Sequence, residues 1–183
     1  MIRTLDIFLS FFGLMITFPI LLMIYIIGLF DTGSPIFKQQ RVGRYKKPFT
    51  LVKFRTMSIE TKSVASHLAN NASITKLGGV LRKTKLDELP QLWNVLKGEM
   101  SLVGPRPGLY NQEDLTAARD AHDVFAVRPG ITGEAQVNDI DMSTPELLAH
   151  TDAKMIRELN LVNYFRFIVQ TVLGKGRGDR VKI

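Results

Sequence analysis

The chain has no cysteine and only three histidines among its 183 residues. Without cysteine there is no disulfide, no thiol nucleophile and no cysteine-bound metal. The histidines, His67, His122 and His150, are too scattered to indicate a zinc site, and we assign them no role. No serine lies in a nucleophile-elbow motif. Any chemistry must therefore come from carboxylates and basic side chains.

Acidic residues are in the minority. The chain has 17 aspartates and glutamates against 24 lysines and arginines, which gives a formal net charge of +7. Such an excess indicates an anionic partner, which can be a phospholipid surface, a nucleic acid or a phosphorylated substrate. No nucleic-acid motif is present and the basic residues adjoin an apolar segment, so the sequence predicts no nucleic-acid partner. The length suits one domain with a real core.

Residues 5–30 form a mostly apolar run. As a straight helix it would extend about 39 Å, against a hydrocarbon core of roughly 30 Å. Pro19 lies within the run and predicts a kink. Both flanks are basic, which places both ends in the cytoplasm by the positive-inside rule. We therefore expect a re-entrant membrane hairpin over residues 1–31, while an ordinary spanning anchor with an external N-terminus remains equally open.

We expect residues 32–183 to form a cytoplasmic catalytic domain with interfacial helices, and the fold class to be α+β, mostly helical. Within residues 31–60, seven basic side chains against two acidic ones lie beside the apolar run, where they would meet anionic headgroups. Residues 49–56 predict a strand, paired with residues 35–37 in a short β-hairpin. Lys53 and Arg55 would then share one face, as candidate phosphate contacts or as solvated charges.

The remaining pattern predicts mainly helix and loop. Expected helices cover residues 76–85, basic, amphipathic and at the membrane surface, 113–125, 145–160 after a Ser143-Thr144 cap, and 161–173 on the core or in the interface; the expected connections are a weakly helical 58–71, a loop over 127–133 and a flexible basic tail over 174–179.

The most informative stretch is residues 86–107. Apolar side chains recur there at helical spacing, and Gly98 is a plausible stop, so we expect a helix from near Asp87 with Pro90 in its first turn. The recurring side chains are Leu89, Leu92, Trp93 and Leu96. Asp87 would lie at the positive end of the helix dipole, which also attracts a phosphate.

An Asp-Glu pair at a helix start is usually a cap or a solvated first turn. The loop that follows favours a functional interpretation. In residues 104–108, two prolines and two glycines surround Arg106 and restrict its backbone. Such a loop fixes the direction of one guanidinium, which binds phosphate through two parallel hydrogen bonds. Asp87, Glu88 and Arg106 together indicate phosphoryl transfer.

Four segments occur in an order that resembles the bacterial sugar transferase family, the monotopic phosphoglycosyl transferases that initiate surface glycan and glycoprotein assembly. They are residues 35–43, 53–57, 86–107 and 128–133. The resemblance implies transfer of a sugar-1-phosphate from a UDP-sugar to polyprenyl (undecaprenyl) phosphate, with release of UMP. It also implies a place on the cytoplasmic leaflet of the bacterial inner membrane, among membrane phospholipid and with downstream glycosyltransferases.

By the same resemblance Asp87 is the nucleophile, which attacks the diphosphate and becomes a phosphoglycosyl-aspartate. Glu88 matches the glutamate that binds Mg²⁺, and Arg106 matches the arginine associated with phosphate. Arg128, which also precedes a proline, is a second candidate phosphate or nucleotide contact. The donor is expected to carry an N-acetylated amino sugar, with a phosphohexose as the alternative.

The chain departs from the family pattern at several positions. Phe18 replaces a serine before Pro19, although Thr17 is placed to bond a freed carbonyl. The other departures are Glu134 where an aromatic is common, Asp139 where glycine is frequent, and Tyr164 where an aspartate is expected. These positions bear on sugar choice and packing. The rival interpretation is a non-catalytic, membrane-associated lipid-binding or scaffold module.

Overall fold

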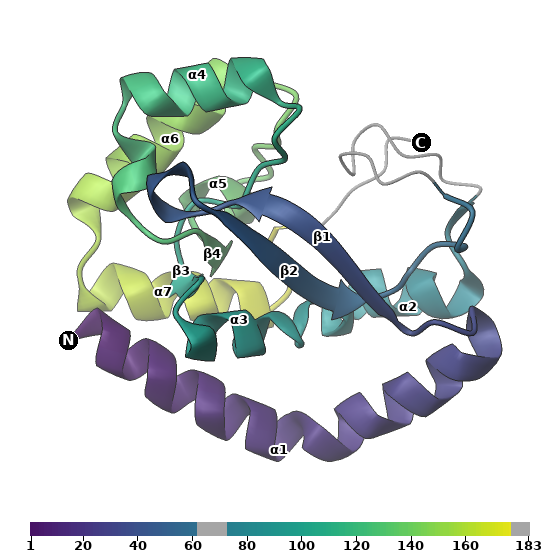
Figure 1. Ribbon diagram of the computed structural model, residues 1–183. Coiled ribbons are helices and arrows are strands. Elements are labelled where there is room, and N and C mark those ends of the chain that lie inside the picture. The colour runs from purple at the N-terminus through teal and green to yellow at the C-terminus, as the bar shows by residue number, and fades with distance from the viewer. Residues whose placement is uncertain (62–72, 177–183) are drawn as a thin grey trace.

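The structure is a computed structural model and describes residues 1–61 and 73–176. The expectations for most of residues 58–71 and for the end of the tail therefore lie outside the described residues. The described part is α+β and mostly helical, as predicted (Figure 1). Its elements are α1 (Ile2–Asp31), β1 (Ile36–Val42), η1 (Arg44–Lys46), β2 (Pro48–Phe54), α2 (Lys76–Thr84), η4 (Leu86–Glu88), α3 (Gln91–Lys97), β3 (Ser101–Val103), α4 (Glu113–Ala121), η5 (Val124–Ala126), β4 (Gly130–Thr132), α5 (Glu134–Val137), α6 (Pro145–Glu158) and α7 (Leu161–Val172).

Helix α1 is one helix of 30 residues with Pro19 inside it, and it bends near its middle (Figure 1). Its two halves pack against different clusters. Leu5 and Leu9 join the main core, whereas Ile24 is buried with Phe54 and Leu81. The bend thus lets one apolar helix touch the domain at both of its ends.

Thr17 does not act as expected at this bend. Pro19 lacks an amide hydrogen and so leaves the Met15 carbonyl without its helical partner. The Thr17 hydroxyl instead bonds the Gly13 carbonyl at 2.6 Å. A hydrogen bond from a threonine hydroxyl to the carbonyl four residues earlier itself favours helix bending. Thr17 therefore adds to the bend at Pro19, but it does not satisfy the carbonyl that Pro19 frees.

Asp6 fixes the first turns of α1 to the core. Its Oδ1 accepts hydrogen bonds from the Ser101 hydroxyl (3.0 Å), the Leu102 amide (3.0 Å) and the Tyr164 hydroxyl (2.9 Å). Asp6 and Tyr164 are 2% and 0% exposed. The departure at Tyr164 therefore has a structural role, since its hydroxyl serves a buried carboxylate that comes from α1.

The predicted β-hairpin is confirmed. Strands β1 and β2 are antiparallel, with Phe37 opposite Lys53. The expected loop over residues 127–133 is partly wrong, because β4 pairs in parallel with β3 inside it. At Gly130 a Cβ atom would lie 2.0 Å from the Gly104 nitrogen, so only glycine permits this close approach.

The predicted helix start near Asp87 is wrong. Asp87 lies in the 3-10 turn η4, and α3 begins at Gln91 after Pro90. Gly98 ends the helix in the left-handed region (φ 85°), as expected. The face of α3 that meets the interior carries two polar residues, Gln91 and Asn94, beside Val95, which belongs to the main core. Trp93 remains exposed, and Leu92 lies against Gly13 of α1.

Other boundaries differ by a few residues. Helix α4 ends at Ala121 rather than continuing to residue 125, because Asp123 adopts a left-handed backbone (φ 55°). Helix α6 starts at Pro145, as expected, and ends at Glu158. Helix α2 starts at Lys76, as expected, and ends at Thr84, and the Thr75 hydroxyl accepts a hydrogen bond from the Gly78 amide at its start.

Candidate active site

The two acidic residues lie in a buried turn. Asp87 and Glu88 are the last two residues of η4. The residue before this turn is Lys85, whose backbone is left-handed (φ 59°). Only 3% of Asp87 and 7% of Glu88 is exposed. Buried carboxylates are costly unless cations or hydrogen bonds balance them, so this turn is far from an ordinary solvated first turn.

Arg106 supplies part of that balance. Its Nη2 lies 2.8 Å from Glu88 Oε1. The loop that carries Arg106 is held by its backbone on both sides, since the Pro105 carbonyl accepts from the Gly130 amide (2.8 Å) and the Pro107 carbonyl from Arg41 Nη1 (3.0 Å). The loop thus presents its guanidinium from a fixed backbone, as the two prolines predict.

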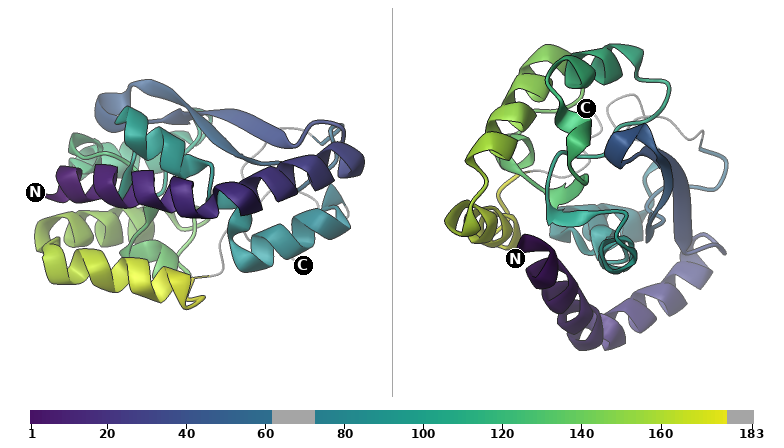
Figure 2. Two further views of the ribbon diagram at one scale, coloured as in Figure 1. Left: turned by 90° about the horizontal axis from the view of Figure 1, so that it is seen from below. Right: turned by 60° about the vertical axis from the view of Figure 1, so that its left-hand side comes forward.

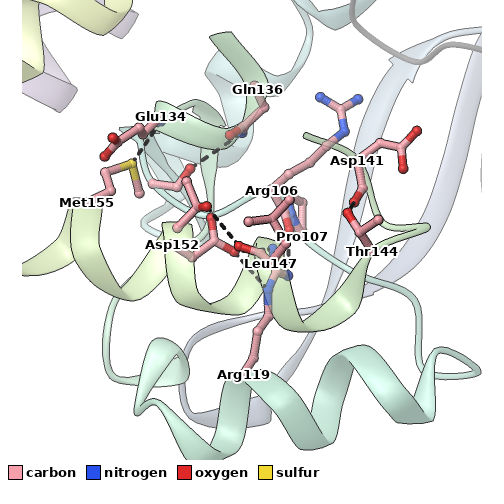
Figure 3. Close-up of polar contacts among 12 residues, drawn as sticks. Arg106, Pro107, Arg119, Glu134, Gln136, Asp141, Thr144, Leu147, Asp152 and Met155 are labelled. Carbon is pink, nitrogen blue, oxygen red and sulfur yellow. Dashed lines mark hydrogen bonds and ion pairs between the residues drawn. The ribbon is translucent and has the colours of Figure 1, made fainter. Parts of the chain in front are cut away.

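A buried ion pair fixes Arg106 itself. Arg119 on α4 donates from Nη1 to the Arg106 carbonyl at 2.8 Å and binds Asp152 Oδ2 through Nε (3.0 Å) and Nη2 (2.6 Å). Figure 3 shows Arg119 reaching from α4 towards Asp152 on α6 and the Arg106 loop. The side chains of Arg119 and Asp152 are 3% and 0% exposed. Sequence reasoning missed both, because a single charge within an ordinary helix carries no signal of its own.

The structure brings only one further predicted cation to Arg106. Lys53 lines a small pocket with Arg106, and unpredicted Arg41 and Gln91 line it too. Arg55 instead bonds the Ser34 carbonyl at 2.8 Å. Arg128 lines a different cavity and donates to the Gly98 carbonyl at 2.8 Å.

Lys85 is a further residue that sequence reasoning missed. Burial lowers the pKa of its ammonium group below the ordinary value of 10.5; Arg106 lowers it further, whereas Glu88 and Asp139 oppose the change. These interactions place the Lys85 charge near Glu88 and Arg106. Asp139 has a left-handed backbone (φ 58°), which explains physically why glycine suits this position.

The donor set fits a Mg²⁺ ion bound largely through substrate. Among the residues that the structure describes, no group of three or more histidine, cysteine, aspartate or glutamate side chains converges. Mg²⁺ usually keeps several waters and takes one or two carboxylates together with phosphate oxygens. The adjacent carboxylates of Asp87 and Glu88 meet that requirement.

One face of the molecule is apolar. Helix α1 is long and apolar enough to cross a membrane, and 11% of its most hydrophobic window is buried. Seen from below, α7 and α2 lie beside α1 (Figure 2). Large exposed apolar residues on these helices include Phe11, Ile16 and Phe18 on α1, Val80 on α2, and Val162, Val169 and Val172 on α7. So many large exposed apolar residues on three neighbouring helices indicate an interaction surface.

Comparison with known proteins finds relatives of one kind. The chain is 37% identical over 191 residues to an uncharacterized sugar transferase of Haemophilus influenzae, covering 93% of this chain and 40% of the relative. It is 39% identical over 162 residues to the undecaprenyl-phosphate galactose phosphotransferase of Salmonella typhimurium, covering 78% and 34%. It is 42% identical over 108 residues to a putative undecaprenyl-phosphate N-acetylgalactosaminyl 1-phosphate transferase of Bacillus subtilis, covering 57% and 60%.

The chain thus spans less than two thirds of the length of each of these three relatives. The family model described as bacterial sugar transferase matches residues 1–176, which include the buried Asp87-Glu88 turn, the Arg106 loop and the bent apolar helix. This chain belongs to the bacterial sugar transferase family.

Proposed function

We propose that this chain is a phosphoglycosyl transferase, which moves a sugar-1-phosphate from a UDP-sugar to undecaprenyl phosphate through a covalent intermediate on Asp87. The observation that carries the proposal is the buried Asp87-Glu88 turn, with Arg106 Nη2 fixed 2.8 Å from Glu88. A scaffold or lipid-binding module has no need for two buried carboxylates opposite an arginine held by a further buried ion pair.

In the first step an Asp87 carboxylate oxygen attacks the phosphorus that bears the sugar. A bond from Asp87 to phosphorus forms, the bond between that phosphorus and the bridging oxygen breaks, and UMP leaves with the electron pair. Arg106 and Lys53 bind the phosphate oxygens, whose negative charge would otherwise repel a carboxylate nucleophile. In the second step a phosphate oxygen of the acceptor attacks the same phosphorus and releases Asp87 as a carboxylate.

Glu88 would hold Mg²⁺, with Asp87 as the neighbouring carboxylate. The bound ion would neutralise the phosphate charge as a Lewis acid. Arg106 has a second task in this scheme, because its bond to Glu88 also orients that carboxylate. Arg119 and Asp152 keep the Arg106 backbone in place.

We further propose that the chain lies in one leaflet, the cytoplasmic one, with α1 as a re-entrant helix. Both ends of α1 contact the same domain. Asp6 bonds Ser101 and Tyr164, while Ile24 packs with Phe54 and Leu81. A straight spanning helix would place its two ends on opposite sides of the bilayer and could not make both sets of contacts.

The proposed donor is a UDP-linked N-acetylated amino sugar. The Bacillus relative has such a sugar in its name, whereas the Salmonella relative has galactose. A donor panel must therefore include both kinds of sugar.

The test is UMP release by the full chain in detergent, with Mg²⁺ and a short-chain polyprenyl phosphate each present or omitted. We expect turnover only with both, and a burst of at most one UMP per chain when the acceptor is omitted. Asp87→Asn should abolish the burst and slow turnover roughly a thousandfold or more. Glu88→Gln should lose activity together with its Mg²⁺ response.

Asp120→Asn is the matched control, since Asp120 is an exposed aspartate whose partner is Lys46. It should retain the activity of the parent chain. Near-normal UMP release by Asp87→Asn would exclude the covalent mechanism. Absence of release from every donor would favour the non-catalytic lipid-binding or scaffold module.

A further inference from the structure

A second cavity also borders the loop that carries Arg106. Its volume is about 240 Å³, against about 10 Å³ for the small pocket beside Arg106. Gly104 and Pro105 of the loop line it, together with the first turns of α1 and the end of α6. In Figures 1 and 2 the N-terminal end of α1 lies beside the corner between α6 and α7.

Three arginines line this cavity: Arg3, Arg44 and Arg128. Each is held by uncharged oxygen atoms. Arg3 donates to the Val95 carbonyl (2.7 Å), Arg44 to the Ala126 carbonyl (2.8 Å), and Arg128 to the Gly98 carbonyl (2.8 Å).

Within residues 1–61 and 73–176 none of these three arginines forms an ion pair with a carboxylate. Asp6, the one acidic residue of the lining, already accepts three hydrogen bonds. The cavity therefore carries a net positive charge, and each guanidinium retains N–H donors beyond those bound to carbonyl oxygens.

The rest of the lining indicates which anion fits. Apolar side chains such as Ile2, Ile156 and Leu159 surround the arginines. Phe8 on α1 and Val162 on α7 are exposed apolar residues that follow the lining residues Asp6 and Leu159 closely in sequence. A phosphate that is attached to an apolar body satisfies both the charges and this position, whereas a free ion uses only the charges.

We propose that this cavity binds the phosphate of an anionic phospholipid head group and thereby fixes the N-terminal end of α1 at the membrane surface. The site is separate from the one at Asp87. It goes beyond the proposed function, because it concerns a structural lipid rather than a substrate.

The test measures binding of short-chain phosphatidylglycerol to the full chain in mild detergent by isothermal titration calorimetry. Arg44→Gln removes one guanidinium from the lining, and we expect it to weaken binding at least about tenfold. Lys47→Gln makes the same charge change at an exposed neighbour outside the lining and should leave binding within about twofold of the parent. Leu159→Glu places a carboxylate among the arginines and should abolish binding.

Two competitors identify the source of the phosphate. Inorganic phosphate that displaces the lipid at equal concentration would overturn the lipid assignment, as would binding of a short-chain polyprenyl phosphate with no binding of phosphatidylglycerol. If Arg44→Gln and Lys47→Gln lose the same amount of lipid affinity, the lipid binds through general surface charge. That result would overturn the proposal that this cavity is the binding site. UMP release is measured separately, so failure here leaves the reaction at Asp87 untouched, and failure of that reaction leaves this site standing.

Discussion

Arg119 and Asp152 form an ion pair that is almost completely buried. This pair holds Arg119 where it donates a hydrogen bond to the Arg106 carbonyl. Arg119→Met would leave Asp152 buried without its partner, which costs about 3–5 kcal/mol of unfolding free energy. Urea denaturation should show this loss, and UMP release should fall with it. The double variant Arg119→Met/Asp152→Leu should recover most of the stability without the activity, because the Arg106 carbonyl still lacks its donor.

The exposed pair Lys46–Asp120 is the control for that experiment, since its side chains are 51% and 55% exposed. Its removal should cost less than about 1 kcal/mol. A double variant of the buried pair with full activity would show that Arg119 only stabilises the fold and does not position Arg106.

Lys85 gives a pH prediction. Its pKa is lowered in the folded chain, chiefly by burial, so the folded state binds this proton less tightly than the unfolded state does. The group's contribution to stability is then present above the unfolded pKa of 10.5 and is lost as the pH falls through the folded pKa. Lys85→Met should therefore stabilise the chain at pH 7, and the gain should shrink towards pH 11.

Thermal unfolding across that pH range measures this gain. The matched variant is Lys83→Met, because Lys83 is an exposed lysine on α2. If both variants gain the same stability at pH 7, the gain comes from the change in surface charge and not from the burial of Lys85.

At the residue scale the sequence identified the groups that carry a motif. Asp87, Glu88 and Arg106 stand in a distinctive order, and the structure places Glu88 against Arg106. Lys85, Arg119 and Asp152 could not be found in this way, since their roles arise from folding segments far apart in sequence against one another.

Among the elements, α2 depends on one glycine. A Cβ atom at Gly78 would lie 2.0 Å from the Thr56 carbonyl oxygen, whereas a Cβ atom at Gly79 would meet nothing within 4 Å. Gly78→Ala should therefore destabilise the chain by about 2 kcal/mol or more. Gly79→Ala should stabilise it by up to about 1 kcal/mol, because alanine favours a helix. Urea denaturation of the two variants decides this, and equal effects would contradict the close contact.

The hairpin and the helices α2, α6 and α7 follow from local sequence, through β-formers, caps and apolar spacing. The three-residue strands β3 and β4 do not, because each is too short to carry a pattern and pairs with a distant segment. The start of α3 differs from its prediction because the apolar spacing runs back to Leu89, whereas the backbone over Leu86–Glu88 forms the separate 3-10 turn η4.

For the whole molecule, the proposed orientation can be tested with the single tryptophan of the chain. Trp93 on α3 is 56% exposed, and its neighbour Leu92 lies against Gly13 of α1. If the apolar face meets the bilayer, Trp93 emission should shift to shorter wavelength on vesicles and be quenched by brominated lipid. A chain with Trp93→Phe and Tyr110→Trp carries the probe near Lys46 instead and should show little quenching. Equal quenching of both probes would contradict the orientation.

The bond between Asp6 and Tyr164 joins residues 158 positions apart. During synthesis Asp6 leaves the ribosome 158 residues before its phenolic partner. The apolar helix must therefore wait with a carboxylate that lacks one of its final donors. The slow closure of so distant a contact makes the docking of this helix a late event in folding, and a chain that stops before α7 should hold it loosely.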